Sequence, residues 1–204
     1  MERVLSVFLC RDITRDDTMR IARWLDNRRV ADNLCEADGI SESIISLGES
    51  VPPCMLSMRL SSGGPFFMIG LPRADGTCGD YSERASGEDY ETESDDYLYN
   101  AEYTDSVGFL KLTERGGDEY EITLAVGEEE LWGHGIGSAS VKSSLAHAFF
   151  ELRASTVTAN IKRQNARSLA IFRGAGFCKV AEGEITDRYA MTRSDFIARS
   201  RSIV

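Results

Sequence analysis

The segment 120–152 constrains the fold most, because it joins a strand to a helix through a glycine-rich loop. Apolar and polar side chains alternate over 120–126, YEITLAV, and this period of two predicts a strand. An acidic turn and the sequence GHGIG at 133–137 follow. From Ser138 to about Leu152 apolar residues recur at helical spacing, which predicts an amphipathic helix. This order predicts a domain in which a helix packs on a sheet.

The glycine loop also predicts a site for a phosphate-bearing ligand. Gly133, Gly135 and Gly137 carry no Cβ, so the backbone can approach a bulky anion closely. Successive amide N–H groups at the start of a helix, aided by the helix dipole, attract a pyrophosphate. No Gly-Lys-Ser/Thr follows, and the spacing is G-x-G-x-G rather than G-x-G-x-x-G, so neither a P-loop nor a dinucleotide fingerprint is present. The alternative interpretation is that the glycines only turn a strand into a helix.

The other elements are predicted from apolar periodicity and from breakers, and together they indicate an α/β or mixed α+β domain spanning 1–204. A helix is expected after Thr14, which forms a capping box with Asp17. Further helices are expected at 41–48, at 54–60, for which a strand is the alternative, and at 164–175. Further strands are expected at 4–10, 66–71, 107–112, 155–161, 177–182 and 187–193, the last two as a hairpin.

The segment 73–105 has a different composition from the rest of the chain. It is crowded with Asp, Glu and Tyr, contains almost no branched aliphatic residues, and has Arg84 as its only base after Arg73. Such a stretch buries too little apolar surface to offset its ordering entropy. We therefore predict a mobile acidic insertion between two strands. Alternatively, its tyrosines and carboxylates form a lid over a polycationic acceptor.

Charge and cysteine usage narrow the class of partner. The formal net charge is −10, which disfavours nucleic acid and anionic membrane surfaces and favours a cationic small molecule or peptide. The five cysteines are scattered without a C-x-x-C pair, and neither histidine stands at ligand spacing from them, so no metal site is expected. No apolar run is long enough to span a membrane and no leader peptide is visible, so a soluble, cytoplasmic protein is predicted.

Two motifs, in the right order, resemble the GNAT family of acetyltransferases. The first is WGHGIGS at 132–138, which resembles the family's acyl-CoA loop, with Trp132 where Gln or Arg is usual. The second is NARSLAIFRGAGF at 165–177, which resembles the signature N-x-x-S-x-x-x-Y/F-x-x-x-G-F. Because it begins with Trp132, the loop is most similar to that of the ribosomal-protein N-terminal acetyltransferases, a branch of the family in which it often reads W-G-K-G-x-A/G-T.

The resemblance implies a fold and a set of binding residues. The fold is a mixed, mostly antiparallel sheet of about six to seven strands flanked by helices, in which two strands splay apart around acyl-CoA. Main-chain groups of 124–126 would bind the pantetheine arm, and Asn165 would lie beside it. The implied coenzyme-binding residues are Leu124, Val126, Trp132, Gly133, His134, Gly135, Ile136, Gly137, Ser138 and Asn165. A solvent-facing spacer is the alternative for His134.

The resemblance also implies a reaction and leaves one role without a residue. An acetyl group would pass from acetyl-CoA to a primary amine by direct attack, without a metal. The acceptor would be a small amine or a protein N-terminus, and the enzyme a monomer or homodimer. Glu121 would be the general base, with an outward-facing strand carboxylate as the alternative. Phe172 stands at the position where the family usually has a tyrosine that acts as general acid. Because phenylalanine cannot donate a proton, the alternative is a regulatory module that binds the coenzyme without turnover.

Overall fold

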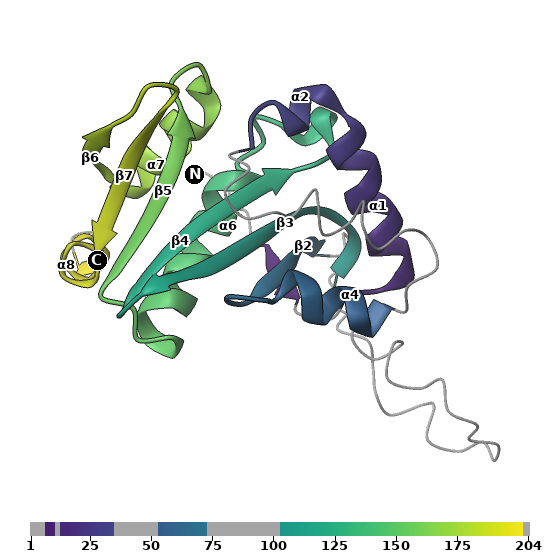
Figure 1. Ribbon diagram of the computed structural model, residues 1–204, viewed down its shortest axis with the longest axis horizontal. Coiled ribbons are helices and arrows are strands. Elements are labelled where there is room, and N and C mark those ends of the chain that lie inside the picture. Colours follow the sequence, from purple (N-terminus) through teal and green to yellow (C-terminus); the bar gives the residue numbers. More distant parts are fainter. Residues whose placement is uncertain (1–6, 11–12, 35–52, 73–102, 202–204) are drawn as a thin grey trace, which may run out of the picture.

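The computed structural model describes residues 7–10, 13–34, 53–72 and 103–201, and its described strands form one seven-stranded sheet (Figure 1). The strand order is β1-β2-β3-β4-β5-β7-β6, and every neighbouring pair is antiparallel except β4 with β5. The strands are β1 (Phe8–Cys10), β2 (Phe66–Pro72), β3 (Tyr103–Gly116), β4 (Glu119–Val126), β5 (Thr156–Lys162), β6 (Cys178–Glu182) and β7 (Thr186–Thr192). This confirms the predicted mixed, mostly antiparallel sheet flanked by helices.

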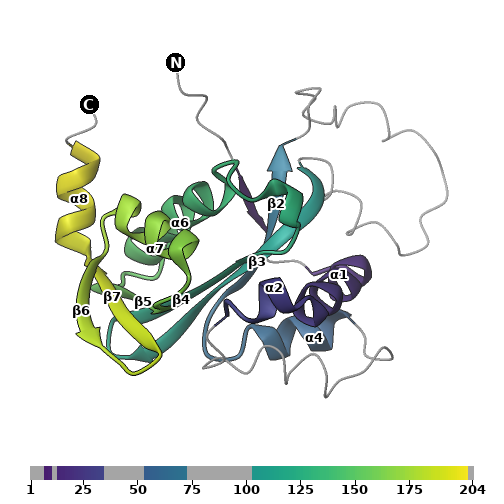
Figure 2. The ribbon, with the colours of Figure 1, turned by 90° about the horizontal axis from the view of Figure 1, so that it is seen from above.

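Helices cover both faces of the sheet. Figure 2 shows α1, α2 and α4 on one side of it and α6 and α7 on the other. The helices are α1 (Arg15–Asp26), α2 (Arg28–Ala31), α4 (Pro53–Leu60), α6 (Ile136–Ala146), α7 (Ala166–Ala175) and α8 (Arg193–Arg201). A 3₁₀ turn, η2 (Glu129–Leu131), precedes the glycine loop, and a π-helical turn, η3 (His147–Glu151), extends α6.

Most expected elements are present, and two predicted segments fall outside the described residues. The helix expected at 41–48 belongs to these, as does nearly all of the acidic segment 73–105. Its last residues, from Tyr103 onward, begin β3, which pairs with β2 on the other side of the segment. The helix expected at 54–60 is α4, and the hairpin expected near the C-terminus is β6 with β7.

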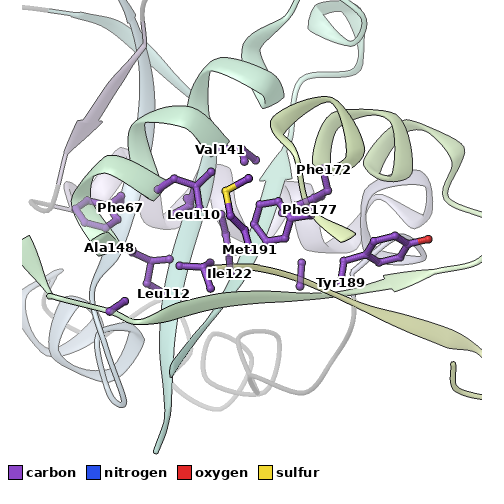
Figure 3. Packing of buried hydrophobic residues seen from close by; sticks show 14 of the residues in the cluster. Phe67, Leu110, Leu112, Ile122, Val141, Ala148, Phe172, Phe177, Tyr189 and Met191 are labelled. Atoms are coloured by element: carbon purple, nitrogen blue, oxygen red, sulfur yellow. The ribbon is translucent and has the colours of Figure 1, made fainter. Parts of the chain in front are cut away.

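The two faces of the sheet bury two hydrophobic clusters. On β4, Ile122 belongs to the cluster under α6 and α7, whereas Ala125 belongs to the cluster under α1 and α4. Alternation along the strand therefore divides its side chains between both clusters, as the period of two predicts. Figure 3 shows part of the larger cluster, with Phe67 and Tyr189 at opposite ends and Met191 and Phe177 between them.

Helix α1 begins and packs as its sequence indicates. The Thr14 hydroxyl accepts a hydrogen bond from the Asp17 amide at 3.2 Å, and the Asp17 carboxylate accepts one from the Thr14 amide at 3.0 Å. This is the predicted capping box. Trp24 is buried and stacks against Phe109, with 6.5 Å between ring centroids. Its indole N–H donates to Glu128 Oε1 at 3.0 Å, which ties α1 to the turn before the glycine loop.

Two helices begin at residues other than those predicted. Helix α6 begins at Ile136 rather than Ser138, because Gly135 adopts a left-handed conformation as N-cap and accepts the first helical hydrogen bond, from the Ala139 amide. Helix α7 begins at Ala166 rather than Gln164, because the Asn165 side chain caps it by accepting from the Ser168 amide at 3.1 Å.

Two features near the ends of helices had no predicted counterpart. In the π-helical turn, His147 is largely buried: its ring meets Phe67 edge-on, and Nδ1 lies 2.9 Å from Glu151. Helix α8 has few apolar residues to reveal it, and Phe196 anchors it by packing against Phe149 at 5.2 Å between centroids. Both depend on contacts with distant residues, which a local pattern does not contain.

Gly108 on β3 leaves no room for a side chain, and Gly108→Ala is expected to destabilise the protein. A Cβ there would lie 2.2 Å from the main-chain oxygen of Ala125 on β4, and that backbone cannot yield. We expect the free energy of unfolding, measured by urea denaturation, to fall by about 1–3 kcal/mol. In Gly174→Ala, where a Cβ meets nothing within 4 Å, it should instead rise by about 0.4–1 kcal/mol. Equal stability of the two variants would contradict this account of the β3–β4 contact.

Candidate functional site

The sheet opens between its two parallel strands. Residues Glu119–Glu121 of β4 pair with Thr156–Thr158 of β5, and no further pairs follow, although β4 continues to Val126 and β5 to Lys162. Figure 1 shows the two strands diverging beyond this point. Of the described strands, only β3 therefore lies beside the second half of β4.

The main-chain groups of Leu124 and Val126 face this opening. Gly127 donates its amide hydrogen to the Val107 carbonyl at 2.9 Å, so by antiparallel alternation Ala125 also bonds to β3, while Leu124 and Val126 point the other way. The Val126 carbonyl accordingly accepts a hydrogen bond from the indole Nε1 of Trp132 at 2.7 Å. An extended ligand in the opening can thus pair with β4 as a strand would.

The glycine loop forms a cradle at the far end of the opening. Gly133 and Gly135 have φ angles of 85° and 84°, and a Cβ on either would meet nothing within 4 Å. Within the described residues, the amides of 135–138 have no backbone acceptor, as expected at the start of a helix. Gly137 serves packing, since its Cβ would lie 2.8 Å from Ile171 Cδ1 on α7. The cradle therefore presents free N–H donors and open space together.

A cavity of about 300 Å³ joins the strand opening to the cradle. All of the predicted binding residues line it except His134, which is exposed and lies outside the lining. The cavity wall contains Leu124, Val126, Trp132, Gly133, Gly135, Ile136, Gly137, Ser138 and Asn165. The structure thus brings together residues from β4, the glycine loop and α7.

Helix α2 adds wall residues that the sequence analysis missed, and helix α7 adds a basic one. Arg29, Asn33 and Leu34 come from α2 and the residues after it, and Arg167 comes from the first turn of α7. Arg167 lies inside the second motif. The α2 residues lie about a hundred positions from the loop, and no local pattern links them to it.

The electrostatics of the cavity differ from those of the whole protein. Among the described residues, the charged members of its wall are Arg29 and Arg167, in a chain of formal net charge −10, and Arg29 is paired with Glu129. Both guanidinium groups lie over the Trp132 ring, at 5.5 Å and 3.8 Å from its centroid. A positive lining with free amides suits an anionic ligand.

Asn165 and Lys162 hold the end of α2 across the strand opening. The Asn165 amide nitrogen is 3.5 Å from the Asn33 carbonyl, while its oxygen caps α7. The Lys162 ammonium donates to the Asp32 carbonyl at 2.7 Å. Asn165 lines the cavity, and its polar atoms already bind protein groups. Its contribution here is to position α2 and α7.

Glu121 lies buried where β4 and β5 part. Its Oε2 accepts from Arg115 Nε and its Oε1 from Asn160 Nδ2, both at 2.8 Å. It borders a second cavity of about 30 Å³, which shares Asn33, Leu34 and Leu124 with the larger one. It is therefore not an outward-facing carboxylate, since 6% of its surface is exposed.

Phe172, at the position of the family's tyrosine, and the described tyrosine Tyr189 both belong to the larger hydrophobic cluster. Phe172 lines the small cavity and packs edge-on against Phe177, with centroids 5.0 Å apart. Tyr189 is 2% exposed, its hydroxyl accepts from Arg173 at 2.9 Å, and it lines neither cavity. Neither position therefore places a tyrosine hydroxyl at the described cavities.

A family model decides the affiliation of this chain. The model of the acetyltransferase (GNAT) domain matches residues 64–178, which is more than half of the chain and includes β2–β5, the glycine loop and α7. The chain belongs to the GNAT acetyltransferase family. A search of curated proteins returned no match.

Solved structures show the same GNAT fold at low sequence identity. A domain from Methanocaldococcus jannaschii has a TM-score of 0.61 at 21% identity, covering 92% of this chain and 99% of that one. The Vibrio cholerae spermidine N-acetyltransferase, in complex with CoA and spermine, has 0.60 at 13%, covering 94% and 98%. AAC(6')-Ib, in complex with paromomycin and acetyl-CoA, has 0.61 at 14%, covering 98% and 99%.

Other kinds of site are not found in the described part of this GNAT domain. Within residues 7–10, 13–34, 53–72 and 103–201, no cluster of three or more His, Cys, Asp or Glu could hold a metal ion. In the same ranges, no helix has the length and apolar character needed to cross a membrane. Cys10, which is buried, and Cys178, which is exposed, are not joined in a disulfide.

Proposed function

We propose that this GNAT domain is an N-acetyltransferase that moves an acetyl group from acetyl-CoA to a primary amine. The observation that carries the proposal is the continuity of the strand opening with the glycine cradle. Main-chain groups at Leu124 and Val126 suit an amide-bearing arm, and the free amides of 135–138 suit a pyrophosphate. One elongated ligand with both parts is a coenzyme A thioester.

The residues present accept such a ligand without rearranging the loop. The Val126 carbonyl retains a second lone pair beside the Trp132 indole, so it can also accept from the pantetheine arm. The open space above Gly133 and Gly135 admits phosphate oxygens that a side chain would displace. Arg167 supplies positive charge in the same wall.

The transfer requires removal of a proton from the amine. Bound acetyl-CoA supplies the thioester carbonyl carbon, which the amine attacks directly to form the C–N bond as the C–S bond breaks. We assign Glu121 the base role, since its buried carboxylate lies at the point where the strands part. Arg115 and Asn160 orient it. With Phe172 in the tyrosine position, we propose that the CoA thiolate leaves without being protonated. A thiol has a pKa of about 8.5, so its thiolate is a good leaving group.

The acceptor is proposed to be a cationic amine or a protein N-terminus. The structural relatives include enzymes solved with spermine and with paromomycin, and the net charge of −10 favours cations. The W-G-x-G loop at 132–135 supports the N-terminal acetyltransferase branch over the small-amine enzymes. Fold alone does not select among them.

A second candidate is a module that binds acyl-CoA without turnover. Two observations favour it: Phe172 cannot donate a proton, and both Glu121 oxygens already accept hydrogen bonds from Arg115 and Asn160. This candidate shares the binding site and differs only in chemistry.

Two measurements on the purified protein distinguish the candidates. Acetyl-CoA is expected to raise Tm, because a ligand that binds only the folded state stabilises it. A panel containing spermine, an aminoglycoside and short peptides with free N-termini is then tested for release of CoA thiol. Binding with thiol release supports the transferase, and binding without release from any amine supports the binding module. Absence of any shift with acetyl-CoA, alongside a shift with ATP, would refute both.

A further inference from the structure

Arg167 stands in an unusual position for a cation. It lies in the first turn of α7, where the helix dipole disfavours positive charge. Its guanidinium carbon is 3.8 Å from the Trp132 ring centroid, and the residue is exposed at the wall of the larger cavity. Among the residues with described placement, no carboxylate pairs with it. Stacking therefore holds the charge in place without neutralising it.

The other basic side chains near this end of the cavity are committed elsewhere. Arg29 forms an ion pair with Glu129. Lys162 donates to the Asp32 carbonyl, and Arg163 pairs with Asp187 at 3.0 Å. Of these four cations, Arg167 is therefore the one whose guanidinium N–H groups can donate to an anion from outside the protein.

We propose that Arg167, stacked on Trp132, binds the 3′-phosphate of coenzyme A and makes this chain select CoA over carriers without that group. The inference rests on the proposed function. The pyrophosphate already has its donors in the amides of 135–138. The 3′-phosphate is the remaining anionic group of CoA, and a planar guanidinium can donate two parallel hydrogen bonds to it.

Trp132 has a defined part in this arrangement. Its N–H is fixed on the Val126 carbonyl at 2.7 Å, so the ring plane is set, and the guanidinium lies over its face. Stacking on an aromatic face leaves the N–H edge of arginine free for a phosphate. Trp132, where the family has Gln or Arg, thus acts as a platform for a cation supplied by α7.

The test compares CoA with dephospho-CoA, which lacks only the 3′-phosphate, by isothermal titration calorimetry. Wild type is expected to bind CoA more tightly, on the order of ten- to a hundredfold. In Arg167→Met the affinity for CoA should fall to that for dephospho-CoA, whose own affinity should not change. Arg59→Met is the matched control, since it removes the same charge from an exposed site on α4, and it should keep the wild-type ratio.

Each other outcome has a definite meaning. Equal binding of the two ligands by wild type would overturn the assignment of Arg167 while leaving the proposed function intact. Equal weakening of both ligands in Arg167→Met would also overturn it, because that result places Arg167 at the pyrophosphate or in the loop. If Arg167→Met does not fold, the assignment is decided by the ratio of the affinities for CoA and dephospho-CoA, measured for Arg167→Lys and for wild type. Failure of wild type to bind either ligand would instead refute the proposed function.

Discussion

Replacing Glu121 by glutamine is expected to lower kcat about 10²–10⁴-fold, the range typical of a lost general base. Affinity for acetyl-CoA should stay close to wild type, because Glu121 borders the small cavity and lies outside the wall of the larger one. Thiol release with the best amine of the panel measures kcat, and calorimetry measures affinity.

The matched control is Glu114→Gln on the neighbouring strand β3. Glu114 is exposed, and its loss removes the same charge without touching either cavity. Because Glu121 pairs with Arg115, Tm is measured for both variants to separate stability from catalysis. Unchanged turnover in a folded Glu121→Gln that still binds acetyl-CoA would show that Glu121 is not the base.

Trp24→Ala is expected to cause the largest loss of stability, about 3–5 kcal/mol in the free energy of unfolding. The indole is 2% exposed and packs between Phe109 and Gly127, where a Cβ on the glycine would lie 2.1 Å from the ring. Its removal leaves a cavity between α1 and the sheet. The loss is measured by urea denaturation at equilibrium.

Two variants show which property of Trp24 matters. Met19→Ala lies on the same helix with 59% of its surface exposed, and should change stability by no more than about 0.5 kcal/mol. Trp24→Phe keeps most of the packing and removes the hydrogen bond to Glu128, so it should fall between the two. If Trp24→Ala were as mild as Met19→Ala, the packing role assigned to Trp24 would be wrong.

Local patterns predicted the secondary structure where the deciding contacts are close in sequence. The capping box of Thr14 with Asp17, the alternation over β4 and the turn into α6 each depend on residues within a few positions. The start of α6 was placed two residues late, because the left-handed N-cap at Gly135 was not counted as a helix start. Helix α8 was missed because its anchor, Phe196 on Phe149, is a tertiary contact.

The candidate site likewise has a part that local sequence predicts and a part that depends on tertiary contacts. The glycine cradle and the second motif are continuous in sequence, and the structure places all of the predicted binding residues except His134 at one cavity. The partners of Glu121 come from two other strand positions, Arg115 and Asn160, and could not be read from the residues around it. The charge of the cavity wall likewise depends on Arg29, which α2 brings from far along the chain.

The sequence by itself determined the local backbone of this protein, because helix caps, strand alternation and glycines with positive φ are set by neighbouring residues. It also determined the family, through two motifs in order. Only the tertiary structure decided where β4 and β5 separate, which cations remain open to a ligand and which carboxylate is buried. These properties depend on packing and charge pairing between residues that are distant in sequence, and such pairings arise only when the whole sheet has formed.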